Sequence, residues 1–354
     1  MRRMSKLASA ASAITVALAL TACGSDTDDG EADPGTGGEG SGESSDLIVG
    51  LAYDVGGRGD QSFNDSAAAG ADQAVEEYGF QLEEAEATDG EAESAREERL
   101  ITFAEAGVDP IIAVGFAYAP SVAKVAKEFP ETHFALIDSS DATGENIANL
   151  LFAEEQGSFL VGAAAALESK AGNVGFVGGV NTPLINKFEA GFKAGVEAVD
   201  PSIQVQSQYL TEIPDFSGFG DPAKGKTTAQ GMFDNGADIV YHAAGGSGGG
   251  VFEAAAESGG KAIGVDSDQF ETADPSVQDV IITSMLKKVD VGVYDYLTEV
   301  DGGTFPSGPV TYDLKVDGVG YSTSGDMLAQ KTIDELEKFK QQIIDGDITV
   351  PTKP

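Results

Sequence analysis

Short apolar runs alternate with segments of helical periodicity along most of the chain. Residues 47–53 form an apolar run that ends at Asp54, and a glycine-rich turn separates this run from residues 64–78. In that second segment small apolar residues recur at three-to-four spacing, which is typical of an amphipathic helix. The pattern therefore predicts a buried strand, a loop and a helix whose first turn Asn64 or Asp65 can cap.

The same alternation continues towards the C-terminus. Further strands are expected at residues 80–87, 110–115, 133–138, 173–177, 203–210, 238–242, 261–265, 281–285 and 310–316. Helices are expected at residues 92–106, 120–129, 159–167, 184–199, 223–233, 251–257, 287–300 and 334–344. Strands that alternate with helices favour parallel, doubly wound sheets. Because the alternation restarts near Glu154, we expect two similar α/β blocks with a cleft between them, an arrangement typical of a hinged binding protein.

Acidic, amide and aromatic side chains follow the ends of several predicted strands. Asp54, Asp138 and Asp266 each end a strand, and Phe63 and Asn64 follow in the loop after the first one. In open α/β sheets ligands bind beyond the carboxyl ends of the strands, so these side chains stand where a ligand would lie. Structural roles as turn caps, a helix cap or core filling remain open for each of them at this point.

The N-terminus has the pattern of an exported lipoprotein. Basic residues precede an apolar core at residues 7–20, which is shorter than a typical membrane span. Leu20-Thr-Ala-Cys23 then resembles a bacterial lipobox, so residues 1–22 are expected to be a signal peptide and Cys23 to carry lipid. Residues 23–46 carry only acidic charges and predict a flexible tether. A lipid-anchored position on the extracytoplasmic face of the cell membrane follows.

The charge and the histidine and cysteine counts exclude several function classes. The formal net charge is −38, which repels nucleic-acid phosphates and disfavours nucleic-acid binding. The chain has two histidines and one cysteine, the one at position 23, so we expect no metal-ligand cluster. The sequence shows no convincing pair of nucleophile and base, and no cofactor motif in its proper context. We therefore expect neither an enzyme nor a bound cofactor.

Two motifs resemble those of enzymes. Residues 220–227 match the G-x-x-x-x-G-K-[ST] pattern of phosphate-binding loops, but Pro222 removes a backbone donor and Asp221 adds negative charge where phosphate would lie. The preceding residues predict a loop rather than the required strand. Residues 284–287 match the S-x-x-K pattern of serine acyl-enzymes, whose companion S-D-N and K-T-G elements are missing. Neither motif predicts catalysis here.

Several motifs recur together in one order and resemble a known family. They are Asp54-Val-Gly-Gly, Asp60-Gln-Ser-Phe-Asn64, Gly175-Phe-Val-Gly-Gly179, Lys187-Phe-Glu-Ala-Gly-Phe-Lys-Ala-Gly195, His242-Ala-Ala-Gly-Gly246, Gly264-Val-Asp266 and Thr283-Ser-Met-Leu-Lys287. Together, over about residues 47–344, they resemble the basic membrane protein family, the PnrA-like nucleoside-binding lipoproteins of ABC transporters.

The resemblance implies a type I periplasmic-binding-protein fold, in which two doubly wound α/β lobes are joined by three crossovers. The crossovers are expected near residues 149–153, 281–284 and 310–316. On this basis residues 47–150 plus 284–310 would form the N-terminal lobe. Residues 151–283 plus 311–354 would form the C-terminal lobe.

The resemblance also implies binding roles in the first lobe. Phe63 would stack on a planar base, and Asp54 and Asn64 would shape the same part of the pocket. Asp138, at the end of its strand, would face the base.

In the second lobe the resemblance implies that Phe188 covers the other face of the base. Gly245-Gly246 would allow the ligand to approach the backbone closely. Asp266 would accept hydrogen bonds from ribose hydroxyls, and Lys287 would donate to the ribose, with Lys288 as a rival.

The implied function is that of a monomeric receptor that binds a nucleoside, in the first instance a purine nucleoside. The receptor would deliver it to a permease and its ATPase. Three aspartates against one lysine should disfavour phosphate, so nucleosides are expected rather than nucleotides. Two alternatives stay open: the same fold could bind a sugar or a signalling molecule, or a surface enzyme could act on nucleosides through Asp266 and Lys287. The preference between purine and pyrimidine also stays open.

Overall fold

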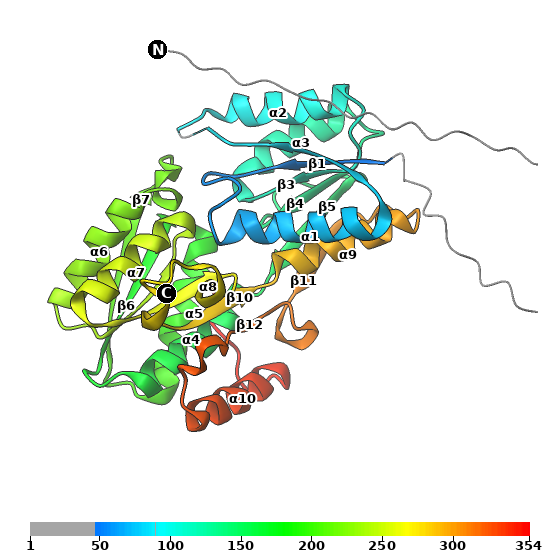
Figure 1. The fold of residues 1–354 in the computed structure, drawn as a ribbon. Helices are drawn as coiled ribbons and strands as arrows, with labels where there is room; N and C mark the ends of the chain where they lie inside the picture. The colour runs from blue at the N-terminus through cyan, green and yellow to red at the C-terminus, as the bar shows by residue number, and fades with distance from the viewer. Residues whose placement is uncertain (1–46, 89) are drawn as a thin grey trace, which may run out of the picture. The chain divides into compact units, whose positions relative to one another are not determined.

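The computed structural model describes residues 47–88 and 90–354 (Figure 1). The predicted signal peptide at residues 1–22 and the predicted tether at residues 23–46, with Cys23, lie outside the described residues. Two six-stranded sheets organise the described part of the chain. The predicted fold class, α/β with two doubly wound and largely parallel sheets, is confirmed.

The first sheet is parallel throughout and carries helices on both faces. Its strands, in spatial order, are β11 (Gly308–Tyr312), β5 (Ile147–Phe152), β4 (Phe134–Ile137), β3 (Ile111–Ala113), β1 (Ile48–Ala52) and β2 (Gln81–Ala85). Its helices are α1 (Phe63–Tyr78) and α9 (Val289–Asp301) on one face and α2 (Glu93–Glu105) and α3 (Ala119–Glu128) on the other (Figure 1).

The burial pattern explains this layering. Ile111 packs with the α2 and α3 side chains, whereas its neighbour Ile112 packs with those of α1 and α9. Successive side chains of a strand point to opposite faces, and both faces of this sheet are covered. The inner strands β1, β3 and β4 therefore read as continuous apolar runs rather than as an alternating pattern.

The second sheet repeats this design, except that its edge strand β12 runs antiparallel to β10. Its strands, in spatial order, are β12 (Val319–Tyr321), β10 (Ile281–Lys287), β9 (Lys261–Asp266), β8 (Ile239–Ala243), β6 (Asn173–Asn181) and β7 (Gln204–Glu212). The helices of this half are α4 (Glu154–Glu168), α5 (Pro183–Val199), α6 (Pro222–Asp234), α7 (Gly248–Ser258), the short α8 (Gln269–Thr272) and the terminal α10 (Gln330–Ile344). The first sheet with α1, α2, α3 and α9 is the first lobe. The second sheet with α4 to α8 and α10 is the second lobe.

The chain passes between the two sheets three times. The first passage lies between β5 and α4, the second between β10 and α9, and the third between β11 and β12. The sequence placed the second passage near residues 281–284, but β10 pairs with β9 from Ile281 to Leu286 and so lies in the second sheet. The passage follows Lys287. The apolar run predicted the strand, whereas the sheet that a strand joins depends on distant residues.

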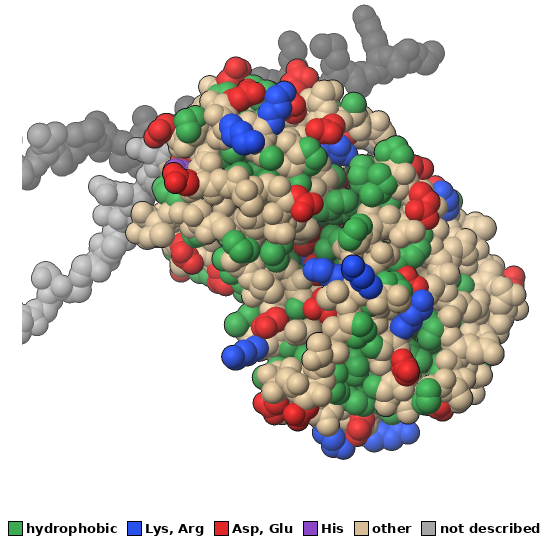
Figure 2. Space-filling view, turned by 180° about the vertical axis from the view of Figure 1, so that it is seen from behind, with side chains coloured by type: hydrophobic (Ala, Val, Ile, Leu, Met, Phe, Trp, Pro, Cys, Tyr) green, Lys and Arg blue, Asp and Glu red, His purple; other side chains and the backbone are tan. Residues whose placement is uncertain are grey.

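The third passage begins after Tyr312, inside the predicted range, because β11 pairs with β5 along its whole length. Residues 311 and 312 therefore belong to the first sheet, although the sequence assigned them to the second lobe. Seen from behind, acidic side chains are dispersed over both lobes rather than gathered in one patch (Figure 2).

Candidate functional site

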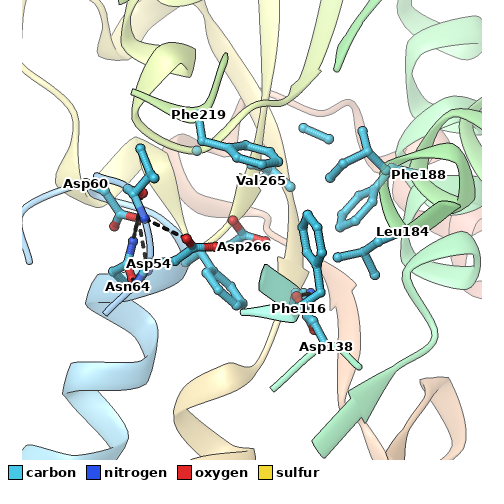
Figure 3. Close-up of a pocket in the computed structure, with 16 residues that line it drawn as sticks. Asp54, Asp60, Asn64, Phe116, Asp138, Leu184, Phe188, Phe219, Val265 and Asp266 are labelled. Carbon is cyan, nitrogen blue, oxygen red and sulfur yellow. Dashed lines mark hydrogen bonds and ion pairs between the residues drawn. The ribbon is translucent and has the colours of Figure 1, made fainter. Parts of the chain in front are cut away.

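A cavity lies where the carboxyl ends of strands from both sheets meet (Figure 3). Of the predicted binding residues, all but one line it: Asp54, Phe63, Asn64, Asp138, Phe188, Gly245, Asp266 and Lys287. Gly246 is the exception and lines a neighbouring groove. The structure thus brings together residues that are up to 233 positions apart in the sequence.

One wall of the cavity is a hydrogen-bonded cluster in the loop between β1 and α1. The side-chain oxygen of Asn64 accepts from the backbone N–H of Asp54 at 3.0 Å, and its amide nitrogen donates to Asp60 at 3.0 Å (Figure 3). Asp60 also accepts from the backbone N–H groups of Ser62, Asn64 and Asp65 at 2.9, 2.9 and 3.1 Å. The cluster fixes the loop against the first turn of α1.

Asp60 therefore serves as the capping side chain that the sequence assigned to Asn64 or Asp65. The helix begins at Phe63, so Asn64 lies within its first turn and its amide is free to hold Asp54. Carboxylates are stabilised at helix N-termini, where backbone N–H groups lack partners within the helix. The sequence offered one signal for the capping role of Asp60: it is an acidic residue two positions before Ser62, which directly precedes the helix.

Asp138 and Asp266 end their strands in a backbone conformation that is rare for side chains other than glycine. Their φ angles are 69° and 64°, in the left-handed region. Such residues cluster at binding sites, where the surrounding structure holds them in place. Both carboxyl groups line the cavity, and Asp266 accepts a 2.6 Å hydrogen bond from the hydroxyl of Ser62 in the other lobe.

Burial makes these carboxyl groups unusually weak acids. It raises the pKa of Asp266 to about 7, although Lys287 and the Ser62 hydroxyl oppose the shift. It raises the pKa of Asp138 to about 6 against the effect of Lys287, and the pKa of Asp54 to about 6 against the effect of the Val55 N–H. The charge of the cavity therefore changes near neutral pH.

Lys287 is the cation of the cavity. Its side chain is almost wholly buried, and its Nζ lies 2.5 Å from Asp138 Oδ2 and 3.1 Å from Glu154 Oε1. Burial alone would lower the pKa of Lys287, but the nearby carboxylates outweigh burial and raise it above the ordinary range of lysine. Its neighbour Lys288 instead pairs with Asp317 outside the cavity. The structure thus places Lys287, and not Lys288, in the cavity.

Aromatic rings supply the apolar part of the wall. Phe63 and Phe188 lie with their ring centroids 5.0 and 5.6 Å from Lys287 Nζ, within the range of cation–π attraction. Phe116 and Phe219 add two rings from opposite lobes, with centroids 6.5 Å apart (Figure 3). Sequence reasoning missed Phe116 and Phe219 because both lie in 3₁₀ turns outside any periodic segment.

The enzyme-like motifs do not form active sites. In the G-x-x-x-x-G-K-T segment, helix α6 already begins at Pro222, and Lys226 pairs with Glu253 and Glu257 on α7. Ser284 is buried and accepts a hydrogen bond from the backbone N–H of Gln269. Among the described residues no group of three or more His, Cys, Asp and Glu is placed to hold a metal ion. None of the described helices combines the length and apolar character that a membrane span needs.

Comparisons with known proteins agree with this geometry. The family described as "ABC transporter substrate-binding protein PnrA-like" matches residues 48–353. The CD4+ T-cell-stimulating antigen of Listeria innocua is 35% identical over an alignment 360 positions long, which covers 96% of each chain. The ABC transporter nucleoside-binding protein BmpA of Lactococcus lactis is 33% identical over 331 residues, 87% of this chain and 90% of that protein.

Among solved structures, a solute-binding protein of an ABC transporter system from Aeropyrum pernix superposes with a TM-score of 0.76 at 31% identity. The match covers 86% of this chain and 93% of that one. The family that matches is one of substrate-binding proteins and not of enzymes. The chain belongs to the PnrA-like family of ABC transporter substrate-binding proteins.

Proposed function

We propose that this substrate-binding protein captures a nucleoside in the cavity between its lobes. The observation that carries the proposal is the composition of the cavity wall, which combines phenyl rings from both lobes with buried carboxyl groups and one buried ammonium. A nucleoside offers the matching features, a flat aromatic base and a sugar with vicinal hydroxyls. The similarity to a relative named as nucleoside-binding supports the same reading.

Phe63 and Phe219 are the rings best placed to hold a base. They come from opposite lobes, and both are only partly buried, so that part of each ring is exposed. Phe188, to which the sequence assigned the second stacking role, is 3% exposed and packs beside Lys287. Stacking of a base on an aromatic side chain contributes about 1–3 kcal/mol. We therefore assign the second face of the base to Phe219.

Polar groups in the cavity are available for the sugar and for the edge of the base. Asp138 Oδ1 is buried and accepts no hydrogen bond from the described residues, so that a ligand N–H or O–H would satisfy it. Asp266 would accept from a ribose hydroxyl, and Lys287 would donate to one. A site built to hydrogen-bond hydroxyls rejects analogues that lack them.

The charges of the cavity favour a nucleoside over a nucleotide. Four carboxyl groups line it, against one lysine that is already paired with Asp138 and Glu154. A phosphate would bring negative charge into this environment, and none of the described residues that line the cavity offers an unpaired cation to receive it. We expect a purine nucleoside to bind at least about a hundredfold more tightly than its 5′-phosphate, a difference of about 2.7 kcal/mol.

The context of this activity is import. As the binding component of an ABC transporter, the protein would deliver the nucleoside to a membrane permease driven by an ATPase. Cys23, if lipidated, would hold it on the extracytoplasmic face of the membrane. Each lobe supplies part of the contacts, so the ligand binds the closed arrangement better than an open one and favours closure.

A thermal-shift screen followed by calorimetry tests the proposal. The compounds are adenosine, guanosine, inosine, uridine, free bases, D-ribose and AMP. We expect the midpoint of unfolding to rise with one or more nucleosides and to stay unchanged with AMP. Nucleosides that leave it unmoved, or a sugar alone that raises it, would overturn the proposal.

Adjacent lysines provide a matched pair for the same measurement. Lys287→Met should abolish nucleoside binding because it removes the donor in the cavity, whereas Lys288→Met should leave the affinity within about twofold because Lys288 lies outside it. Circular dichroism of both variants checks that they fold. Equal losses in the two variants would contradict the assignment of Lys287.

A further inference from the structure

The ion pairs of Lys287 continue beyond the cavity through a second carboxylate. Glu154 has no exposed surface and bridges two lysines, with Oε1 3.1 Å from Lys287 Nζ and Oε2 2.9 Å from Lys187 Nζ. Glu154 does not line the cavity, and the side chain of Lys187 is one-third exposed. A line of alternating charges thus runs from Asp138 in the cavity, through Lys287 and Glu154, to Lys187 near the surface.

Each inner member of this line occupies a place where the chain passes between lobes. Glu154 is the first residue of α4, directly after the first passage, and Lys287 is the last residue of β10, directly before the second. Asp138 follows β4 of the first sheet, and Lys187 lies on α5 of the second lobe. The charges therefore join both lobes at the hinge side of the cavity.

The partners of the Lys287 ammonium limit how many of its N–H donors are left for a ligand. An ammonium has three N–H donors. One donates to Asp138 Oδ2 at 2.5 Å, and the 3.1 Å ion pair with Glu154 draws the ammonium to the hinge side. Because Lys287 lines the cavity, a ligand there can accept from the donors that remain. Without the charge of Glu154, the flexible lysine chain would be held by Asp138 alone.

Lys187 stabilises the buried carboxylate of Glu154. A buried carboxylate is stable only when it is paired, and Lys187 neutralises the second oxygen of Glu154. Burial would lower the pKa of Lys187, but Glu154 raises it overall. The sequence analysis included Lys187 in the Lys187–Gly195 motif, but the proposed function assigns it no role.

We propose that Glu154 is a positioning residue for the ligand site, which holds the Lys287 ammonium where it can donate to a sugar hydroxyl, with Lys187 as its counter-charge. This inference rests on the proposed function for the identity of the ligand. It adds a residue outside the cavity that decides how strongly hydroxyls are recognised.

The test compares Glu154→Gln with Glu189→Gln. Glu189 is a matched control because it is also buried and ion-paired, with Lys193 on the same helix α5, and lies outside the cavity. Calorimetry gives the ratio of affinities for adenosine and 2′,3′-dideoxyadenosine. We expect Glu154→Gln to reduce this ratio about tenfold, or about 1.4 kcal/mol, and Glu189→Gln to leave it unchanged. Partial recovery of the ratio in Glu154→Asp would support the role of the charge.

A second readout needs no ligand. In protein with ¹⁵N-labelled lysine, the Lys287 Nζ resonance, assigned by its loss in Lys287→Met, should move in Glu154→Gln and in Lys187→Met but not in Glu189→Gln. If wild-type protein binds no nucleoside, the proposed function fails while this readout still tests the positioning. A resonance and an affinity ratio that Glu154→Gln leaves unmoved would overturn the inference. If that variant does not fold, an unmoved resonance in Lys187→Met would do the same.

Discussion

At the scale of single residues, the cavity wall holds three acids where little water can reach their carboxyl groups. Asp54, Asp138 and Asp266 have pKa values of about 6, 6 and 7, all above the ordinary value for aspartate. Between the unfolded and the folded pKa the folded protein therefore holds more protons than the unfolded chain. Its free energy of unfolding falls as the pH rises through this window, because the folded state must give those protons up.

Asp266→Asn should therefore stabilise the ligand-free protein at pH 8, by about 1–4 kcal/mol, while it abolishes nucleoside binding. Asparagine tolerates the left-handed backbone of this position and can still accept from Ser62. The stability gained by the substitution should shrink as the pH falls towards 4, because Asp266 of the folded wild-type protein is then protonated and uncharged. Thermal unfolding from pH 4 to pH 8 measures both effects.

Asp326→Asn is the control for this measurement. Asp326 also has a positive φ, 51°, but it is exposed, so the substitution tests the backbone preference of asparagine without the buried charge. We expect a pH-independent change within about 0.5 kcal/mol. If Asp266→Asn were less stable than wild type at pH 8, the account of Asp266 as a buried, destabilising acid would be wrong.

The position of a site residue within its element decides whether the sequence could predict it. Asp54, Asp138 and Asp266 stand at the ends of apolar runs, and the fold rule for strand ends places them at the cavity without further information. Phe219 belongs to a short 3₁₀ turn, and Glu154 begins a helix at a passage between lobes. Their places depend on contacts with residues far away in the chain, which periodicity does not report.

At the scale of elements, glycine sets the distance between paired helices. A Cβ at Gly195 of α5 would lie 2.0 Å from the carbonyl oxygen of Phe159 on α4, and one at Gly162 would lie 2.2 Å from that of Phe192. The two helices thus pack backbone against backbone. The two helices carry two residues of the charged line: Glu154 is the first residue of α4, and Lys187 lies on α5.

Gly195→Ala should destabilise the protein by about 1–3 kcal/mol, because the helices must move apart to admit the methyl group. Gly231→Ala, in α6, should instead stabilise it by up to about 1 kcal/mol, since its Cβ would meet no heavy atom within 4 Å and alanine favours the helix. Urea unfolding of both variants gives the two free energies. Changes of the same sign would refute this account of the α4–α5 contact.

The elements that sequence reasoning missed share a physical cause. β12 has only three residues and α8 is a single turn, whereas β5, between β4 and β11, has its apolar run interrupted by the buried Asn149. None of them carries a periodic pattern long enough to stand out. α4 begins at Glu154 rather than near residue 159. Its first turn is polar, so it lies outside the apolar pattern that predicted the helix, and Glu154 is paired with two lysines.

At the scale of the whole molecule, contacts between the lobes close the cavity on two sides. On one side Ser267 and Gln269 of the second lobe donate to the backbone carbonyls of Ser62 and Gln61, each at 3.0 Å. On the other side Phe216 of the second lobe meets the first lobe through aromatic and cation–π contacts. These contacts would be lost if the lobes moved apart, so they should set how long a ligand stays bound rather than how fast it arrives.

Phe216 offers the cleanest test of this idea because it does not line the cavity. Its ring lies 5.9 Å from that of Phe116 and 5.4 Å from the guanidinium carbon of Arg96, both in the first lobe. Loss of one aromatic and one cation–π contact should destabilise the closed state by about 1–2 kcal/mol. Phe216→Ala should therefore raise the dissociation rate of the nucleoside about five- to thirtyfold and leave the association rate unchanged.

Phe305→Ala is the control for the Phe216 measurement, since Phe305 stacks on His133 in the first lobe, away from the cavity. Stopped-flow measurement of tyrosine fluorescence, or of a fluorescent nucleoside, gives both rates. The closed state is favoured only by ligand contacts and lobe contacts acting together, so a weaker lobe contact must appear as faster escape. A slower association with an unchanged dissociation rate would instead show that Phe216 guides capture, and the two-sided closure described here would be wrong.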